Sequence, residues 1–296
     1  MNPFVTALII ILLGMGVRRA NLLGEGAGQT LSRIILNITL PGVVLTSVSK
    51  ATLPAAAFAL PVAAFIWCGA MLFLGSKLFA SIPKATGGVL ILAMGGYNIG
   101  QFAYPLVEAT WGSEALALLV MVDIGNALVI FTLSYILAGI WAGQPVSYSS
   151  ILRRLLTFVP LLSYLLALTI NLTGLRLPEL VSAPLEILGS ANWGLVMLLV
   201  GLYLRPQVVW VHLKQVLAVL GLRFLLGVGA GLAQFFLLPL PLLVRSVLLV
   251  TVLLPVPMST IPYSLEYKMD PDLAGALVNG SIIISFALLW LTFTLL

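Results

Sequence analysis

Residues 95–105 read Gly95-Gly96-Tyr97-Asn98-Ile99-Gly100-Gln101-Phe102-Ala103-Tyr104-Pro105. They interrupt an apolar segment that otherwise runs from about Gly88 to Leu106. Glycine weakens a helix because it loses more backbone entropy than other residues on folding, and proline lacks the N–H group that a helix needs. The stretch therefore predicts a broken helix that carries two amide side chains, Asn98 and Gln101, at its break.

The composition predicts a polytopic, all-α membrane protein. Of the 296 residues, 61% are hydrophobic and only 8% are charged, whereas a soluble domain has about 25% charged residues. Apolar runs of about 20 residues, the length that spans a bilayer as a helix, recur along the chain. The first run precedes its basic pair, Arg18-Arg19, which favours a retained helix over a signal peptide. Ten membrane-spanning helices are expected, at about 3–17, 28–48, 53–76, 85–107, 114–141, 154–173, 184–204, 213–238, 242–264 and 272–296.

The basic residues are distributed like those that orient a protein in a membrane. Of the 14 Lys and Arg residues, ten fall in odd-numbered loops, three in even-numbered loops and one, Arg223, inside a helix. The positive-inside rule then places the odd loops in the cytoplasm and both termini outside, with the cell membrane as the expected location. The scattered charge does not indicate a nucleic-acid partner. The single cysteine, Cys68, excludes a multi-cysteine metal site, and we expect neither a metal nor a cofactor.

The two halves of the chain resemble each other. Residues 89–126 can be aligned without a gap on residues 247–284, which places the first break on the proline-rich segment from Leu254 to Pro262. The predicted organisation is a five-helix repeat (1–142), a short polar cytoplasmic link (143–153) and a second five-helix repeat (154–296). Because five is an odd number, two such repeats must insert with opposite topology. Inverted-repeat transporters bind their substrates where such broken helices meet near the membrane midplane, here about 85–107 and 242–264.

Three motifs resemble those of the auxin efflux carrier family. Asn98 to Val107, followed by Trp111-Gly112, is similar to the family signature N-x-G-x-x-x-x-P-L-x…G. Pro255 to Leu273 resembles the second crossover of plant PIN-type auxin exporters and its E-Y-x-x-x-P-D-x-L tail, and Leu36 to Pro41 resembles the second helix of the family. The resemblance covers essentially the whole chain.

The resemblance implies ten helices arranged as a scaffold domain and a transport (core) domain, a homodimer, and a small organic anion as substrate. It also implies that Asn98 contacts the substrate carboxylate. The chain departs from the plant proteins at Tyr97, where they have proline, and in its link 143–153, which replaces their long hydrophilic loop. The short link indicates a compact, prokaryote-type member. Auxin-like aromatic acids and dicarboxylates such as malate or malonate both fit an amide-lined site.

Polar side chains at the breaks and in neighbouring helices are the candidate substrate ligands: Asn98, Gln101, Tyr97, Ser259, Thr260, Asn37 and Asn192. Each has a structural alternative, such as capping the broken backbone, bonding carbonyl groups freed by proline, or bonding a neighbouring helix. Four prolines create or border the two crossovers: Pro105, Pro255, Pro257 and Pro262.

Asp123 is the one carboxylate deep in an expected span, and such a group is costly enough to suggest a function. Asn126 follows three residues later, so both side chains belong to one helix face. Either Asp123 binds a coupling H⁺ or Na⁺ beside the first crossover, or it forms a structural pair with Arg223.

Together these patterns predict a secondary transporter that moves a small organic anion by an elevator-like or rocking motion. One alternative is a sodium-coupled carrier resembling the bile-acid symporters, and another is a channel. An intramembrane enzyme is not expected, because the single histidine and one buried aspartate cannot form a catalytic set.

Overall fold

The computed structural model describes residues 2–24 and 26–296, and no strand occurs in these two ranges. Helix is present in every range where it was expected. Contacts divide the chain into two compact units, and each unit draws on both halves of the sequence. The two five-helix repeats, 1–142 and 154–296, remain a prediction.

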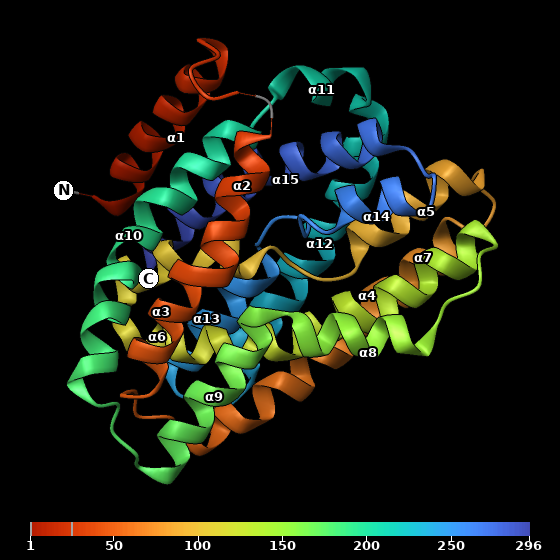
Figure 1. Ribbon diagram of the computed structural model, residues 1–296. Helices are drawn as coiled ribbons and strands as arrows, with labels where there is room; N and C mark the ends of the chain where they lie inside the picture. Colours follow the sequence, from red (N-terminus) through yellow and green to blue (C-terminus); the bar gives the residue numbers. More distant parts are fainter. Residues whose placement is uncertain (1, 25) are drawn as a thin grey trace. The chain divides into compact units, whose positions relative to one another are not determined.

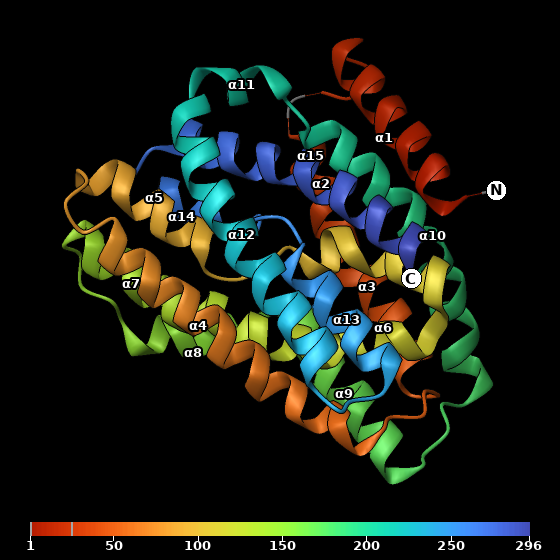
Figure 2. The same ribbon diagram turned by 180° about the vertical axis from the view of Figure 1, so that it is seen from behind.

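The first unit comprises Met1–Ala57, Ile99–Met121 and Thr157–Leu204. Its helical elements are α1 (Pro3–Arg19), α2 (Ala27–Ile34), η1 (Ile35–Thr39), α3 (Leu40–Val48), η3 (Ile99–Ala103), the first part of α6 (Tyr104–Leu128), α9 (Val159–Thr173) and α10 (Glu179–Tyr203). Helices α1 and α10 lie side by side in both ribbon views (Figures 1 and 2). Glycines permit this approach, since a Cβ atom on Gly14 would lie 2.5 Å from the carbonyl oxygen of Leu198.

The second unit comprises Phe58–Asn98, Val122–Leu156 and Arg205–Leu296. It contains α4 (Leu60–Leu78), α5 (Lys84–Met94), the end of α6, η4 (Val129–Ser134), α7 (Tyr135–Ala142), α8 (Tyr148–Thr157), α11 (Pro206–Val211), α12 (Leu213–Leu237), α13 (Leu242–Val252), α14 (Thr260–Glu266) and α15 (Pro271–Leu295). A short 3-10 helix, η2 (Ala55–Ala59), links the two units in the chain. Helix α12 packs on α13, and α5 contacts α4, α7, α12 and α15.

Two π-helical turns occur immediately before prolines. Turn η1 ends at Thr39, two residues before Pro41, and η3 ends at Ala103, two residues before Pro105. A proline removes one N–H group from the helical ladder and pushes away the carbonyl group four residues earlier. The wider π turn accommodates this loss without ending the helix.

Several expected boundaries were wrong where proline acts locally. The helix expected over 154–173 is two helices, α8 and α9, bent by 59° just before Pro160. Helix α8 begins at Tyr148, so the non-helical link covers only residues 143–147 instead of 143–153. Helix α10 begins at Glu179 and contains Pro184 in its interior, whereas the expected helix began at 184.

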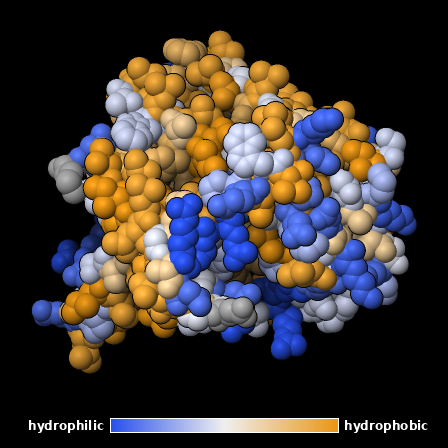
Figure 3. Space-filling view, turned by 90° about the horizontal axis from the view of Figure 1, so that it is seen from above, coloured by the Kyte–Doolittle hydropathy of each residue, from blue (hydrophilic) through white to orange (hydrophobic). Residues whose placement is uncertain are grey.

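Within residues 2–24 and 26–296, six helical segments are long and apolar enough to cross a membrane, or seven if the bent pair α8–α9 counts as one. They are Ala27–Val48, Ala55–Leu78, Ile99–Ala142, Glu179–Tyr203, Leu213–Leu237 and Pro271–Leu295. Apolar side chains cover much of the face seen in Figure 3. Large apolar residues also point outward along α1 and α4, among them Leu13 and Ile66, which suits contact with lipid. The protein is therefore a polytopic, all-α membrane protein, and the ten crossings remain a prediction.

Candidate functional site

The second unit contains both helix breaks. Helix α5 ends at Met94, and Gly96 adopts a φ of +85°, a conformation that other residues rarely adopt. A Cβ atom on Gly96 would also lie 2.8 Å from the side chain of Ile130, so glycine is required here for space as well. Helix α13 ends at Val252, and α14 begins only at Thr260. Both breaks are buried among apolar side chains, so their backbone groups need partners within the protein.

The first break is shorter than expected. Only residues 95–98 are non-helical, because helix resumes at Ile99 in the π turn η3. Gly100, Gln101 and Pro105 therefore lie in helix, and the expectation of a break reaching to Pro105 was wrong. Pro105 is the second residue of α6 and follows the π turn η3. In a π turn the regular α-helical hydrogen bonds are replaced, so the N–H group that proline lacks is not needed there.

The two breaks are hydrogen-bonded to each other. The backbone N–H of Asn98 donates to the carbonyl oxygen of Pro255 over 2.9 Å. One residue further, the N–H of Val256 donates to the hydroxyl of Ser281 in α15 over 2.9 Å. These two hydrogen bonds satisfy backbone groups that the breaks leave without helical partners.

Arg223 of α12 reaches both breaks from a fully buried position. Its guanidinium donates to the carbonyl oxygens of Ala93 and Met94 at 2.9 Å each and of Gly96 at 2.7 Å. A fourth, longer contact of 3.5 Å goes to the carbonyl oxygen of Leu254 in the second break. The guanidinium therefore holds the carboxyl end of α5 and the start of the second break with one positive charge.

Asp123 and Asn126 hold the first break from another side. The side-chain amide of Asn126 accepts from the N–H of Tyr97 over 2.8 Å and donates to the carbonyl of Tyr97 over 3.0 Å. Its Nδ2 also donates to Oδ1 of Asp123 over 2.8 Å. Both side chains are buried, with exposed fractions of 6% and 2%. The pair lies on one helix face, and through Asn126 it positions the backbone of the first break.

The side chain of Tyr97 links the first break to α4. Its hydroxyl accepts a hydrogen bond of 2.8 Å from the indole N–H of Trp67. Its ring lies under the guanidinium of Arg223, with 4.3 Å between the guanidinium carbon and the ring centroid. This cation–π contact stabilises a charge that is shielded from water.

The first residue of α14, directly after the second break, has a hydroxyl group without a hydrogen-bond partner in the described part of the chain. Thr260 is buried, and among the described residues none hydrogen-bonds its Oγ1. Ser259, directly before it, is half-buried, Pro255 and Pro257 are buried in the break itself, and Pro262 lies exposed in the first turn of α14. A buried hydroxyl without a protein partner is unusual and suits a ligand or a water molecule.

The other predicted ligands belong to the first unit. The side-chain amide of Gln101 in η3 donates to the hydroxyl of Ser32. Asn192 in α10 is buried and accepts from the hydroxyl of Thr39 over 2.7 Å. Asn37 is exposed, and its amide donates to the carbonyl of Arg33 in the same helix. Within this unit each of these side chains has a structural hydrogen bond.

Sequence reasoning missed the part that Arg223, Ser281 and Trp67 take in the site. Arg223 was considered only as a possible partner of Asp123, although it was the one basic residue inside an expected span. That position was the available signal, because a buried cation needs several acceptors. Ser281 is a polar residue within an expected span, a position that favours an interhelical hydrogen bond, whereas Trp67 gave no signal, since indole groups are common in membrane helices.

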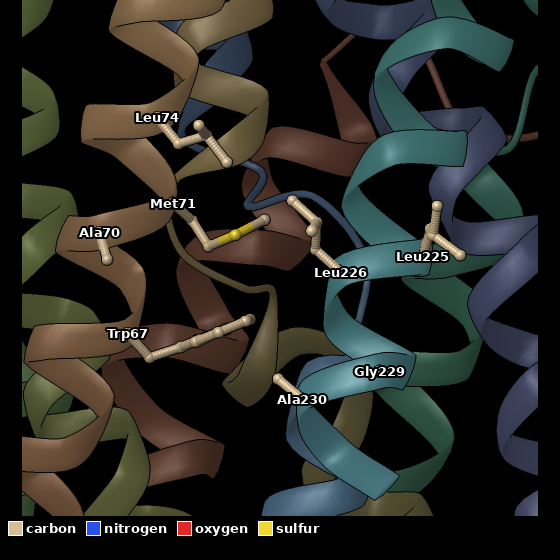
Figure 4. A pocket seen from close by; sticks show the side chains of 8 residues that line it. All are labelled: Trp67, Ala70, Met71, Leu74, Leu225, Leu226, Gly229 and Ala230. Atoms are coloured by element: carbon tan, nitrogen blue, oxygen red, sulfur yellow. The ribbon is translucent and has the colours of Figure 1, made fainter. Parts of the chain in front are cut away.

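A groove of about 450 Å³ lies between α4 and α12. Figure 4 shows Trp67 and Met71 of α4 and Leu226 and Ala230 of α12 pointing into it. Its remaining lining residues are Ala70, Leu74, Leu225 and Gly229, so the lining is apolar apart from the Trp67 indole N–H. The groove lacks the donors that an anion requires, and the helix breaks are the better candidate site.

Comparison with known proteins identifies similarity to membrane transporters in each case. A family model described as "Membrane transport protein" matches residues 1–294. An uncharacterized transporter of Methanothermobacter thermautotrophicus is 28% identical over 287 residues, which cover 95% of this chain and 93% of that protein. An uncharacterized transporter of Methanocaldococcus jannaschii is 26% identical over 292 residues, which cover 93% of this chain and 92% of that protein.

Proposed function

From the family to which this chain belongs, the membrane transport proteins of the auxin efflux carrier type, we infer that it is a secondary transporter for a small organic anion. That it is a membrane transporter and not an enzyme follows from the family match and from the two transporter relatives. The substrate class and the mechanism are the proposal. We place the substrate carboxylate at the two helix breaks of the second unit.

The observation that carries this proposal is the hydrogen bond between Asn98 and Pro255, which brings the two breaks together. Crossing discontinuous helices form the substrate sites of inverted-repeat transporters. Asn98 belongs to this contact between the breaks, and it is buried, with an exposed fraction of 7%. Its amide can donate to a carboxylate oxygen, as the family resemblance implies.

Charge at the crossing favours an anion. The guanidinium of Arg223 lies against both breaks and brings a positive charge into a region of low dielectric. The hydroxyl of Thr260, which has no hydrogen-bond partner among the described residues, offers a further donor in the second break. A carboxylate bound here is attracted by the buried cation without having to contact it.

We further propose that the chain crosses the membrane ten times and transports its substrate by alternating access. The segment Ile99–Ala142 is 44 residues long, about twice the length that one crossing requires, and it bends at Gly112. The short apolar helices α5 and α13 end at the breaks and serve as half-spans. We further propose two inverted repeats, both termini outside, an elevator-like or rocking motion in the cell membrane, and a homodimer.

Ligand-dependent thermal stabilisation of the detergent-purified protein tests the proposal. The panel contains indole-3-acetate, malate and malonate, with chloride as the reference anion. We expect at least one carboxylate to raise the Tm of the parent protein and of the control Gln207→Ala, an exposed amide of the same unit. The same carboxylate should leave the Tm of Asn98→Ala unchanged. A shift that survives in Asn98→Ala, or no shift in the parent, would contradict the proposed site.

A further inference from the structure

The carboxyl end of α5 presents a set of carbonyl oxygens to the interior of the protein. The last carbonyl groups of a helix have no N–H partner within that helix. In α5 this applies to Ala93 and Met94, and Gly96 adds a third carbonyl from the break itself. Since these groups are buried, they need a donor or a cation from elsewhere in the protein.

One cation satisfies all three. Arg223 donates to these oxygens at 2.7–2.9 Å, and its contact to Leu254 adds an oxygen from the second break. The guanidinium presents five N–H donors in a plane and stays protonated in proteins. The face of the Tyr97 ring lies on the same cation at 4.3 Å. The surroundings are those of a cation-binding cage whose cation is part of the chain.

Carbonyl groups at the ends of broken transport helices commonly coordinate a mobile coupling ion such as Na⁺. At the end of α5 that position is taken by a side chain. We propose that Arg223 is a resident cation: its guanidinium occupies the carbonyl cage at the crossover in place of a mobile metal ion, so the crossover is formed without Na⁺. This inference rests on the proposed function. It adds that transport does not require Na⁺, which distinguishes the proposed transporter from the sodium-coupled alternative.

If Arg223 is a resident cation, carboxylate binding and uptake by the unmodified protein should not depend on Na⁺. The carboxylate that raises the Tm in sodium chloride should raise it by the same amount in choline chloride, because choline is too large for the cage. Uptake of that carboxylate into proteoliposomes should likewise be equal in the two salts. A response that is lost in choline chloride overturns the inference but leaves the proposed function intact.

Removing the cation should create a site that an external cation can fill. We expect Arg223→Ala to lower the Tm in choline chloride, and we expect millimolar guanidinium chloride to restore most of the loss. The matched control is Arg245→Ala. Arg245 also donates to a helix-end carbonyl, that of Phe235, over 2.8 Å and lies against the Phe235 ring, but it touches neither break. Guanidinium should leave the Tm of this control unchanged.

Three further results decide the matter. No rescue of Arg223→Ala by guanidinium, or equal rescue of Arg245→Ala, overturns the resident-cation assignment. If Arg223→Ala does not fold, Arg223→Lys retains the charge with fewer donors, and its Tm should lie below that of the parent in both salts alike. A Tm of Arg223→Lys that is higher in sodium chloride than in choline chloride would show that Na⁺ binds the cage beside a charged side chain, which overturns the resident-cation assignment.

The failure of this inference can be told apart from the failure of the proposed function. If no carboxylate shifts the parent in either salt, the anion site is wrong, and guanidinium rescue still tests the cage. If the carboxylate shift is present but needs Na⁺, the anion site stands and Arg223 is a structural residue only.

Discussion

The side-chain amide of Asn126 hydrogen-bonds both the N–H and the carbonyl group of Tyr97, at 2.8 and 3.0 Å. One side chain thus replaces the two helical hydrogen bonds that Tyr97 loses at the break. Both groups are buried, so neither could turn to water if Asn126 were removed.

Asn126→Ala should lower the free energy of unfolding by about 2–4 kcal/mol, because it leaves two buried backbone groups unsatisfied. The comparison is Asn37→Ala, which removes an exposed amide bonded within its own helix and should cost less than about 0.5 kcal/mol. Equilibrium unfolding in detergent micelles measures both. Equal losses in the two variants would show that Asn126 does not support the break.

Asp123→Asn should make transport independent of an imposed pH gradient while the carboxylate still binds. Asp123 holds Asn126 and thereby the first break, so a change in its protonation reaches the proposed site. Uptake into proteoliposomes with and without a pH gradient measures the dependence, with the exposed Asp272→Asn as the control. If Asp123→Asn retains the full pH response of the parent, Asp123 does not bind the coupling proton.

The hydrogen bond between Thr39 and Asn192 should behave as an interhelical pair in a double-mutant cycle. Thr39→Val and Asn192→Leu each leave a buried polar partner, whereas the double variant leaves none. We expect a coupling energy of about 1 kcal/mol, in the range for such bonds in membrane proteins. Additive losses of Tm in the double variant would count against the pair.

Gly14→Ala should destabilise the packing of α1 on α10 by about 1–3 kcal/mol, since the added methyl group would lie against the backbone of Leu198 and Gly201. Gly16→Ala, two residues away in the same helix, places its methyl group in open space and should be neutral or slightly stabilising. Thermal unfolding of the two variants side by side makes the comparison. A loss at Gly16 as large as that at Gly14 would show that contact with α10 does not cause the destabilisation at Gly14.

Much of the fold follows from local sequence patterns. Apolar runs located the ten expected helical ranges, although α11 lies outside them and several helix ends differ, and the glycines near Asn98 and the prolines near Val256 located the two breaks. The spacing of Asp123 and Asn126 placed them on one face, and their side chains are hydrogen-bonded to each other. These features depend on neighbours in the chain, so a single sequence contains them.

Features that depend on distant parts of the chain could not be predicted in the same way. The extent of the first break depends on η3, where a π turn lets helix continue through Gly100 towards Pro105. The bonds of Arg223 join residues that lie up to 130 positions apart. No local pattern indicates that pairing, since burial alone shows that an arginine needs acceptors but not which ones it finds.

The hydrogen bonds between the two breaks also join them into one rigid unit. The N–H of Asn98 is bonded to Pro255, and Arg223 connects Met94 with Leu254, so the ends of α5 and α13 share the same hydrogen bonds. If one half-helix moved along the other, buried carbonyl groups would lose their hydrogen-bond donors. Each hydrogen bond lost in an apolar interior costs several kcal/mol. If the transporter changes conformation, the ends of both half-helices should therefore move together as one rigid body. The hinge of that motion should lie elsewhere in the chain.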